Sequence, residues 1–264
     1  MKIIGIIPAR FASTRFPGKP LTDIEGKSMI RRVYEQAKLA TSLSELIVAT
    51  DDERIKMEVE RFGGKVMMTS PDHRNGTERC AEIAAESEAD VVINIQGDEP
   101  FIHPEQIDLV AGLFTDADTD GMPQIGTLIK TQPLNEELQN PSRVKVVLNK
   151  QMEGIYFSRS VIPFIRNHPH FTVQGFHSKL NFQGAEESGE ATSTFYKHIG
   201  IYGYRRDILL EIVKLSESYL EKAESLEQLR WIENGYHIQC ALTTHDALSI
   251  DTPEDLQSLK SFRR

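Results

Sequence analysis

Basic and hydroxyl side chains are concentrated in one short segment near the amino terminus. Arg10, Ser13, Arg15 and Lys19 come directly after the apolar run 3–7. Such a run is typical of a buried strand, and open α/β sheets bind ligands where their parallel strands end. Guanidinium and ammonium groups suit phosphate oxygens. The segment matches neither G-x-x-x-x-G-K-[ST] nor G-x-G-x-x-G. An ordinary basic surface loop is the alternative, but the position after a strand favours a triphosphate site.

Two acidic segments are candidates for holding a metal ion. Asp98 lies in Asn-Ile-Gln-Gly-Asp-Glu-Pro, at the end of another apolar run. Opposite a triphosphate this carboxylate would bind Mg²⁺, although Gly-Asp-Glu-Pro equally suits a strand-ending turn. Asp251 precedes a helix-start signal in which Thr252 is the cap and Pro253 lies in the first turn. Asp251 is a metal ligand only if the fold brings it to Asp98, and the sequence does not show that.

Further polar segments have both a structural and a functional interpretation. The string 75–79, Asn-Gly-Thr-Glu-Arg, is typical of a turn followed by a helix cap. Arg159 follows an expected strand, where it could pair with a substrate carboxylate. His198 and Tyr202 share one face of another strand, and a lone strand histidine is usually structural. The histidines within 167–193 lack acidic or cysteine partners at familiar metal spacing, so we expect that polar stretch to be a solvated loop.

Alternating apolar runs and amphipathic stretches predict an open α/β architecture with a mostly parallel sheet. We expect one domain over residues 1–264, with a small antiparallel lobe within 125–205. The expected strands are 2–8, 45–50, 66–69, 90–96, 125–129, 144–149, 153–158, 197–204 and 237–243. The expected helices are 28–40, 52–62 (ended by Gly63-Gly64), 77–88, 104–114, 207–214, 225–234 and a last short one opening at 251–255.

Composition narrows the class of protein. Thirty Lys and Arg against 39 Asp and Glu give a formal charge of −9, which argues against nucleic-acid binding because that usually needs a basic face. The two cysteines, Cys80 and Cys240, form no C-x-x-C pair, so neither a disulfide framework nor a structural zinc site is expected. No segment approaches the roughly 18 apolar residues of a membrane helix. We therefore expect a soluble cytoplasmic protein without membrane partners.

Taken in order along the chain, these segments resemble the family of CMP-Kdo synthetases, the 3-deoxy-manno-octulosonate cytidylyltransferases. The resemblance spans nearly the whole chain and rests on the segments 6–10, 96–100, 156–160, 198–205, 225–230 and 251–256. It implies a Rossmann-like sheet of the nucleotide-diphospho-sugar transferase type and a homodimer built through the antiparallel lobe. It also implies transfer of CMP from CTP to Kdo, a 3-deoxy sugar acid, for lipopolysaccharide biosynthesis.

The resemblance also assigns roles to individual residues. Arg10, Ser13, Arg15 and Lys19 would bind the CTP phosphates, and the catalytic residues would be Arg10, Lys19 and Asp98. Mg²⁺ would be held by Asp98 and Asp251. The remaining nucleotide-binding residues would be Asn75, Gly76, Glu78 and Arg79, and the sugar acid would be bound by Gln96, Arg159, His198, Tyr202, Glu227 and Gln228. The family usually has Ser where this chain has Asn75, which puts a contact through that residue in question.

Other functions stay open at this point. A cytidylyltransferase for a related sugar acid, such as 8-amino-Kdo or a sialic acid, would need only small changes in the pocket. A non-catalytic nucleotide-binding assembly protein could keep the sheet and the basic loop, but it would have no reason to retain both Asp98 and Asp251.

Overall fold

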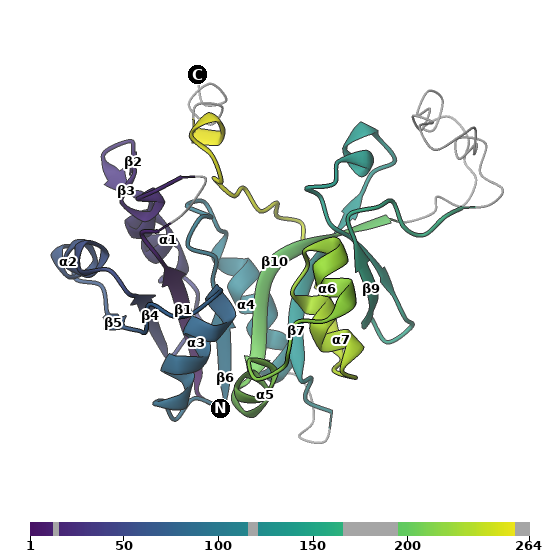
Figure 1. The fold of residues 1–264 in the computed structure, drawn as a ribbon, viewed down its shortest axis with the longest axis horizontal. Coiled ribbons are helices and arrows are strands. Elements are labelled where there is room, and N and C mark those ends of the chain that lie inside the picture. Colours follow the sequence, from purple (N-terminus) through teal and green to yellow (C-terminus); the bar gives the residue numbers. More distant parts are fainter. Residues whose placement is uncertain (13–15, 116–120, 166–194, 257–264) are drawn as a thin grey trace.

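A nine-stranded sheet runs through the centre of the molecule (Figure 1). The computed structural model describes residues 1–12, 16–115, 121–165 and 195–256. The main path of the sheet follows the order β11-β7-β10-β6-β1-β4-β5. The bounds of these strands, in chain order, are β1 Ile3–Ala9, β4 Glu45–Thr50, β5 Val66–Met68, β6 Val91–Asn94, β7 Ile125–Gln132, β10 Phe195–Arg205 and β11 Ile238–Leu242.

The sheet is mostly parallel, as predicted. Strands β4, β1 and β6 pair in parallel, as do β4 with β5 and β11 with β7. Strand β10 is the exception on this path, because it runs antiparallel between β6 and β7. Strand β1 therefore lies deep in the sheet with a parallel neighbour on each side, which explains why its sequence is apolar at nearly every position.

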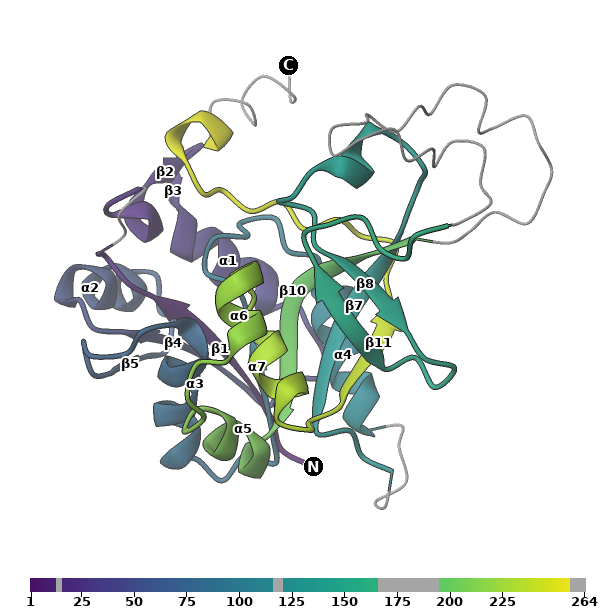
Figure 2. The same ribbon diagram turned by 45° about the vertical axis from the view of Figure 1, so that its right-hand side comes forward.

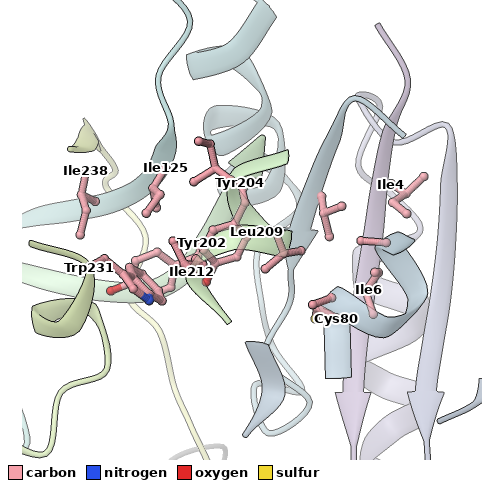
Figure 3. Packing of buried hydrophobic residues seen from close by; sticks show 14 of the residues in the cluster. Ile4, Ile6, Cys80, Ile125, Tyr202, Tyr204, Leu209, Ile212, Trp231 and Ile238 are labelled. Carbon is pink, nitrogen blue, oxygen red and sulfur yellow. The ribbon is translucent and has the colours of Figure 1, made fainter. Parts of the chain in front are cut away.

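Both faces of the sheet are covered, and alternation along β1 shows how. Ile4 and Ile6 point into one core, whereas Ile3 and Ile7 point into the other, as expected for a strand with a period of two. The first core is closed by helices α3 (Gly76–Ala85), α5 (Arg206–Ile212) and α7 (Gln228–Glu233), and the second by α1 (Met29–Ala37), α2 (Glu53–Arg61) and α4 (Pro104–Thr115). Figure 3 shows the first core, where Trp231 lies beside Tyr202.

A small antiparallel extension grows from the sheet, also as predicted. Strands β8 (Lys145–Leu148) and β9 (Gly154–Ser158) pair with each other, and β8 pairs with the start of β10. The buried Lys145 ammonium ties this extension together, since it donates to the carbonyls of Asn140, Arg143 and Arg159 at 3.1, 2.7 and 2.6 Å. Burial lowers the pKa of Lys145 to about 8.

The segment after β11 crosses back over the molecule. Figure 2 shows it running from β11 to the neighbourhood of the short strands β2 (Asp23–Ile24) and β3 (Lys27–Ser28). There the buried Ile250 packs in a small cluster with Ile24 and Met29. Thr252 caps the helical turn that follows, as predicted, because its hydroxyl accepts from the Asp255 amide at 3.3 Å. Asp251 is therefore held at a defined place although it follows the last strand.

One predicted helix is wrong in its bounds, and another helix was missed. The predicted helix 225–234 is interrupted at its start, because Ser225 has a left-handed backbone (φ 51°) and ends the preceding helix α6 (Tyr219–Glu224). Helix α7 begins only at Gln228. No residue of α6 is buried, so it has no apolar stripe to detect. Its signal is the capping box of Ser218 and Glu221. Two short 3₁₀ helices, Lys19–Leu21 and Glu136–Gln139, complete the described elements.

Candidate active site

A cleft of about 300 Å³ opens at the carboxyl ends of β1 and β6. This is the edge at which open α/β sheets bind ligands. Of the predicted site residues, the cleft brings together Arg10, Lys19, Asn75, Gly76, Arg79, Gln96, Asp98 and Asp251. Ser13, Arg15 and the predicted loop 167–193 lie outside the described residues. The cleft therefore gathers much of the predicted nucleotide and metal machinery in one place.

Two carboxylates converge on one lysine in this cleft. Lys19 Nζ donates to Asp98 Oδ2 at 2.9 Å and to Asp251 Oδ1 at 3.2 Å. The backbone reinforces the approach, because the amide of Ile250 donates to the carbonyl of Asp98 at 2.9 Å. Both carboxylates are partly exposed to the cleft. The arrangement creates a position that favours positive charge next to a basic cleft wall.

The start of α3 forms the opposite wall. The Asn75 side chain caps the helix by accepting from the Glu78 amide at 2.9 Å, as the sequence predicted. A Cβ on Gly76 would lie 3.0 Å from Pro8 Cγ, so this position favours glycine where α3 approaches the end of β1. Arg79 is buried and held by Asp51 (3.0 Å) and by Thr69. Arg79 therefore contributes to the cleft lining from a fixed position.

Two residues of this wall were not predicted. Arg74 and His73 line the cleft. Glu78, which was predicted, does not line it but pairs with Arg74. Arg74 Nε donates to Glu78 Oε1 at 2.7 Å. Burial acts to raise the pKa of Glu78, but hydrogen bonds from the side chain and backbone of Arg74 outweigh it and hold the pKa below its usual value. His73 pairs with Glu82. The basic pair His-Arg directly before the cap was the available signal.

Glu227 connects the cleft wall formed by the start of α3 to the elements predicted to hold the sugar acid. Its Oε1 accepts from Asn75 Nδ2 at 3.1 Å and its Oε2 from Thr77 Oγ1 at 2.9 Å. Burial raises the pKa of Glu227, against the hydrogen bond from Thr77, which lowers it. Its neighbour Gln228 is buried at the start of α7. Neither Glu227 nor Gln228 lines the cleft itself, but Glu227 contacts a residue that does.

Strand β10 meets the same region from the other side. Gln96 Nε2 donates to the carbonyl of Gly200 at 2.9 Å. His198 packs edge-on against Phe157 and shares a hydrogen bond of 3.0 Å with the Thr127 hydroxyl. Burial lowers the pKa of His198 to about 3, so its ring is neutral at physiological pH.

Two buried polar atoms lie where β6 and β10 pair. Asn94 and Tyr202 are directly opposite each other in the register. Within the described residues, Asn94 Oδ1 and the Tyr202 hydroxyl have no hydrogen-bond partner. Burying a polar atom without a partner costs free energy. Tyr202 therefore retains an unused hydrogen-bonding group in the region predicted to hold the sugar acid.

Arg159, which was predicted to bind the sugar acid, does not line this cleft. Its guanidinium donates to the carbonyls of Glu224, Pro141 and Ser225 at 2.7, 3.0 and 3.1 Å. The side chain thereby fixes the left-handed turn at Ser225, two residues before Glu227. In this arrangement Arg159 organises the backbone that presents Glu227 and Gln228.

Glu99 was not singled out from the sequence. It is buried beside Asp98, and burial, reinforced by the neighbouring Asp98 charge, raises its pKa to about 8. The string Gly-Asp-Glu-Pro therefore contains one carboxylate that faces the cleft and one that does not. Composition alone does not distinguish them.

The fold and the cleft place this chain in the class of nucleotidyltransferases. A solved nucleotidyl transferase from Methanothermobacter thermautotroptrophicus shares the fold, with a TM-score of 0.58 and 12% identity over 99% of this chain and 97% of that one. The model of the cytidylyltransferase family matches residues 4–239. A solved CMP:2-keto-3-deoxy-manno-octonic acid synthetase complexed with CTP superimposes with a TM-score of 0.85 and 40% identity, covering 100% of this chain and 98% of that one.

Curated relatives narrow the class further. The 3-deoxy-manno-octulosonate cytidylyltransferase of Parabacteroides distasonis is 51% identical over 99% of this chain and 98% of its own length. That of Cytophaga hutchinsonii is 50% identical over 97% of this chain and 95% of its own length. The chain belongs to the 3-deoxy-manno-octulosonate cytidylyltransferase family. In the described residues, no helix is long and apolar enough to cross a membrane.

Proposed function

We propose that this protein transfers CMP from CTP to 3-deoxy-manno-octulosonate, releasing pyrophosphate. The observation that carries the proposal is the convergence of Lys19, Asp98 and Asp251 at the mouth of a basic cleft. A non-catalytic nucleotide-binding protein has no need for paired carboxylates there. The family membership and the likeness to a synthetase complexed with CTP support both the nucleotide and the acceptor.

We further propose that Asp98 and Asp251 hold Mg²⁺. The two carboxylates fit the ion, because Mg²⁺ is usually bound by one or two carboxylates together with phosphate oxygens and water. Lys19 already shows that a positive charge is favourable between them. Bound there, Mg²⁺ would neutralise charge on the phosphates in the transition state.

The protein's own groups bind and orient the two substrates. Arg10, Arg74 and Arg79 line the cleft and supply positive charge to the triphosphate. In the proposed reaction the anomeric hydroxyl of the sugar acid attacks the α-phosphorus of CTP, its proton passes to solvent, and the bond to pyrophosphate breaks. No covalent enzyme intermediate is needed, so the positioning of the two substrates contributes much of the acceleration.

Glu227 is placed to couple the two binding regions. It holds Asn75 and Thr77 at the cleft wall formed by the start of α3 and lies next to Gln228 in the region assigned to the sugar acid.

We also propose a homodimer formed through the antiparallel extension, a cytoplasmic location and a role in supplying lipopolysaccharide biosynthesis. These three proposals rest on the family alone.

The test is pyrophosphate release from CTP with Mg²⁺, measured with and without 3-deoxy-manno-octulosonate, and with ATP, GTP and UTP in parallel. Release that requires both CTP and this sugar acid supports the proposal. Release only with 8-amino-Kdo or a sialic acid would keep the mechanism and change the acceptor. No release with any of the three would leave a nucleotide-binding protein without this activity.

A further inference from the structure

Three metal-ligating side chains meet outside the active site, where the segment after β11 passes the start of α4. His103 and Glu105 flank Pro104 at the beginning of α4, and His245 comes from the crossing segment. Their ligand atoms all lie within 4.8 Å of one another. In the described part of the chain, this is the one group of three or more such residues that is close enough to hold a metal ion. None of the three lines the active-site cleft.

Both histidine side chains lie near one carboxylate oxygen of Glu105. Glu105 Oε2 is 2.9 Å from His245 Nε2 and 3.9 Å from His103 Nδ1. The two imidazole rings are stacked, with centroids 3.6 Å apart and planes within 10°.

The donor set selects the kind of ion. Two imidazole nitrogens and one carboxylate oxygen suit Zn²⁺ and similar transition metals, whereas Mg²⁺ prefers an all-oxygen environment. Tetrahedral Zn²⁺ needs ligand atoms somewhat closer together than 4.8 Å. The side chains are partly to largely exposed, so small χ rotations can bring them in and unstack the rings. A fourth position remains for water.

We propose that His103, Glu105 and His245 form a second, peripheral metal site that binds one Zn²⁺. Such an ion would fasten the crossing segment to α4. The same segment ends at Asp251. Asp246, the residue after His245, already pairs with Lys130 and Lys197. The site stands on its own geometry and does not depend on the proposed reaction.

The test measures Zn²⁺ binding by the full chain after EDTA treatment and desalting. Zn²⁺ is titrated against a chromophoric chelator, and the unaltered protein and its variants all keep the active-site carboxylates, so any binding there is common to all of them. The double variant His103→Ala/His245→Ala should bind one equivalent fewer than the unaltered protein. His237→Ala is the matched control, because it removes an exposed histidine whose Nδ1 lies 3.6 Å from the Glu153 carboxylate, with no third ligand among the residues that the structure describes.

Glu105→Gln provides a second variant that replaces only one largely exposed group. It should weaken Zn²⁺ binding at least tenfold and reduce the visible absorption of the Co²⁺-substituted protein, while thermal unfolding in EDTA stays as in the unaltered protein. Equal stoichiometry and affinity in the unaltered protein and the double variant would overturn the proposal. So would the absence of Zn²⁺ binding by the unaltered protein at micromolar concentrations.

Discussion

The Asp98 carboxylate is the residue on which the proposed chemistry depends most directly. Replacing it by Asn keeps its size but removes the charge that faces Lys19 and, in the proposal, Mg²⁺. We expect turnover to fall at least 100-fold, a loss of about 2.7 kcal/mol in transition-state stabilisation. Because the side chain is partly exposed, the melting temperature should change little. Pyrophosphate release and thermal unfolding measure the two quantities.

Asp207→Asn is the control for that experiment, since Asp207 pairs with Arg205 on an exposed surface away from the cleft. Its turnover should stay within about twofold of the unaltered protein. Turnover of Asp98→Asn within threefold of the unaltered protein at saturating Mg²⁺ would remove Asp98 from the mechanism.

His198 makes the stability of the fold depend on pH. Its pKa is about 3 in the folded protein because of burial, against an ordinary histidine pKa of 6.5. Below pH 6.5 the unfolded chain binds a proton that the folded protein does not, so stability falls as the pH is lowered towards 3. Between pH 6.5 and pH 5 this one group accounts for a loss of about 1.6 kcal/mol.

Replacing His198 by Gln should remove that part of the acid destabilisation. Urea unfolding at pH 6.5 and pH 5 gives the comparison, with the exposed His237→Gln as the control. An equal drop in the unfolding free energy for the unaltered protein and His198→Gln would show that the ring is not desolvated as the structure indicates.

The sequence could predict where several candidate site residues lie, but not which residues they contact. The basic loop and Asp98 follow apolar runs, so their location at the sheet edge was predictable. The meeting of Asp98 with Asp251 was not, because it depends on the path of the segment after β11. Arg159 shows a second limit: its position after a strand suggested pairing with a substrate carboxylate, but the sequence could not show the carbonyls around it, which come from residues distant in sequence.

At the scale of elements, the crossing segment is the part that positions Asp251. Asp246 fastens this segment to β7 and β10 through Lys130 and Lys197. Burial acts to raise the pKa of Asp246, but the two lysines outweigh it and lower the pKa. Lys197 is buried, so removing its partner leaves a charge that is costly in the interior.

We therefore expect Asp246→Asn to lower kcat about tenfold and to raise the Mg²⁺ concentration needed for half-maximal activity. Asp246→Glu, which restores the charge, should recover part of both. Mg²⁺ titrations of the three proteins measure the effect. An unchanged Mg²⁺ dependence in Asp246→Asn would show that the segment is held without this carboxylate.

Long elements with a regular buried face were predicted, whereas helix α6, which buries no residue, was missed. Strands β1 and β4 and helices α1 and α2 bury regular sets of apolar residues, and their predicted bounds differ by at most a few residues. Helix α6 buries none and is held by its capping box and by hydrogen bonds to its neighbours. Such contacts leave no periodic pattern in the sequence.

At the scale of the whole molecule, the two cores stabilise the protein independently of the cleft. Phe114 is fully buried in the core between α4 and the sheet. Its ring packs closely against β10, since a Cβ on Gly203 would lie 2.7 Å from Phe114 Cε2. Phe114→Ala should cost about 3–5 kcal/mol, a large share of the roughly 5–15 kcal/mol that stabilises a typical domain.

The Phe114→Ala protein should therefore unfold at a much lower temperature and yet retain near-normal turnover per folded molecule well below that temperature. Circular dichroism melting and activity assays at 15 °C and 37 °C test this. Leu39→Ala, at an exposed position, is the control. Loss of turnover at 15 °C in a folded Phe114→Ala protein would show that this core also shapes the cleft.

The late position of Asp251 in the chain gives the site an order of assembly during synthesis. Strands β1 and β6, with Lys19 and Asp98, leave the ribosome well before the segment that follows β11. A nascent chain can begin to form the sheet and the basic wall, but its second carboxylate arrives only after the last strand has been made. In the proposed mechanism, a half-made protein is then able to attract a triphosphate without being able to hold the ion needed to cleave it.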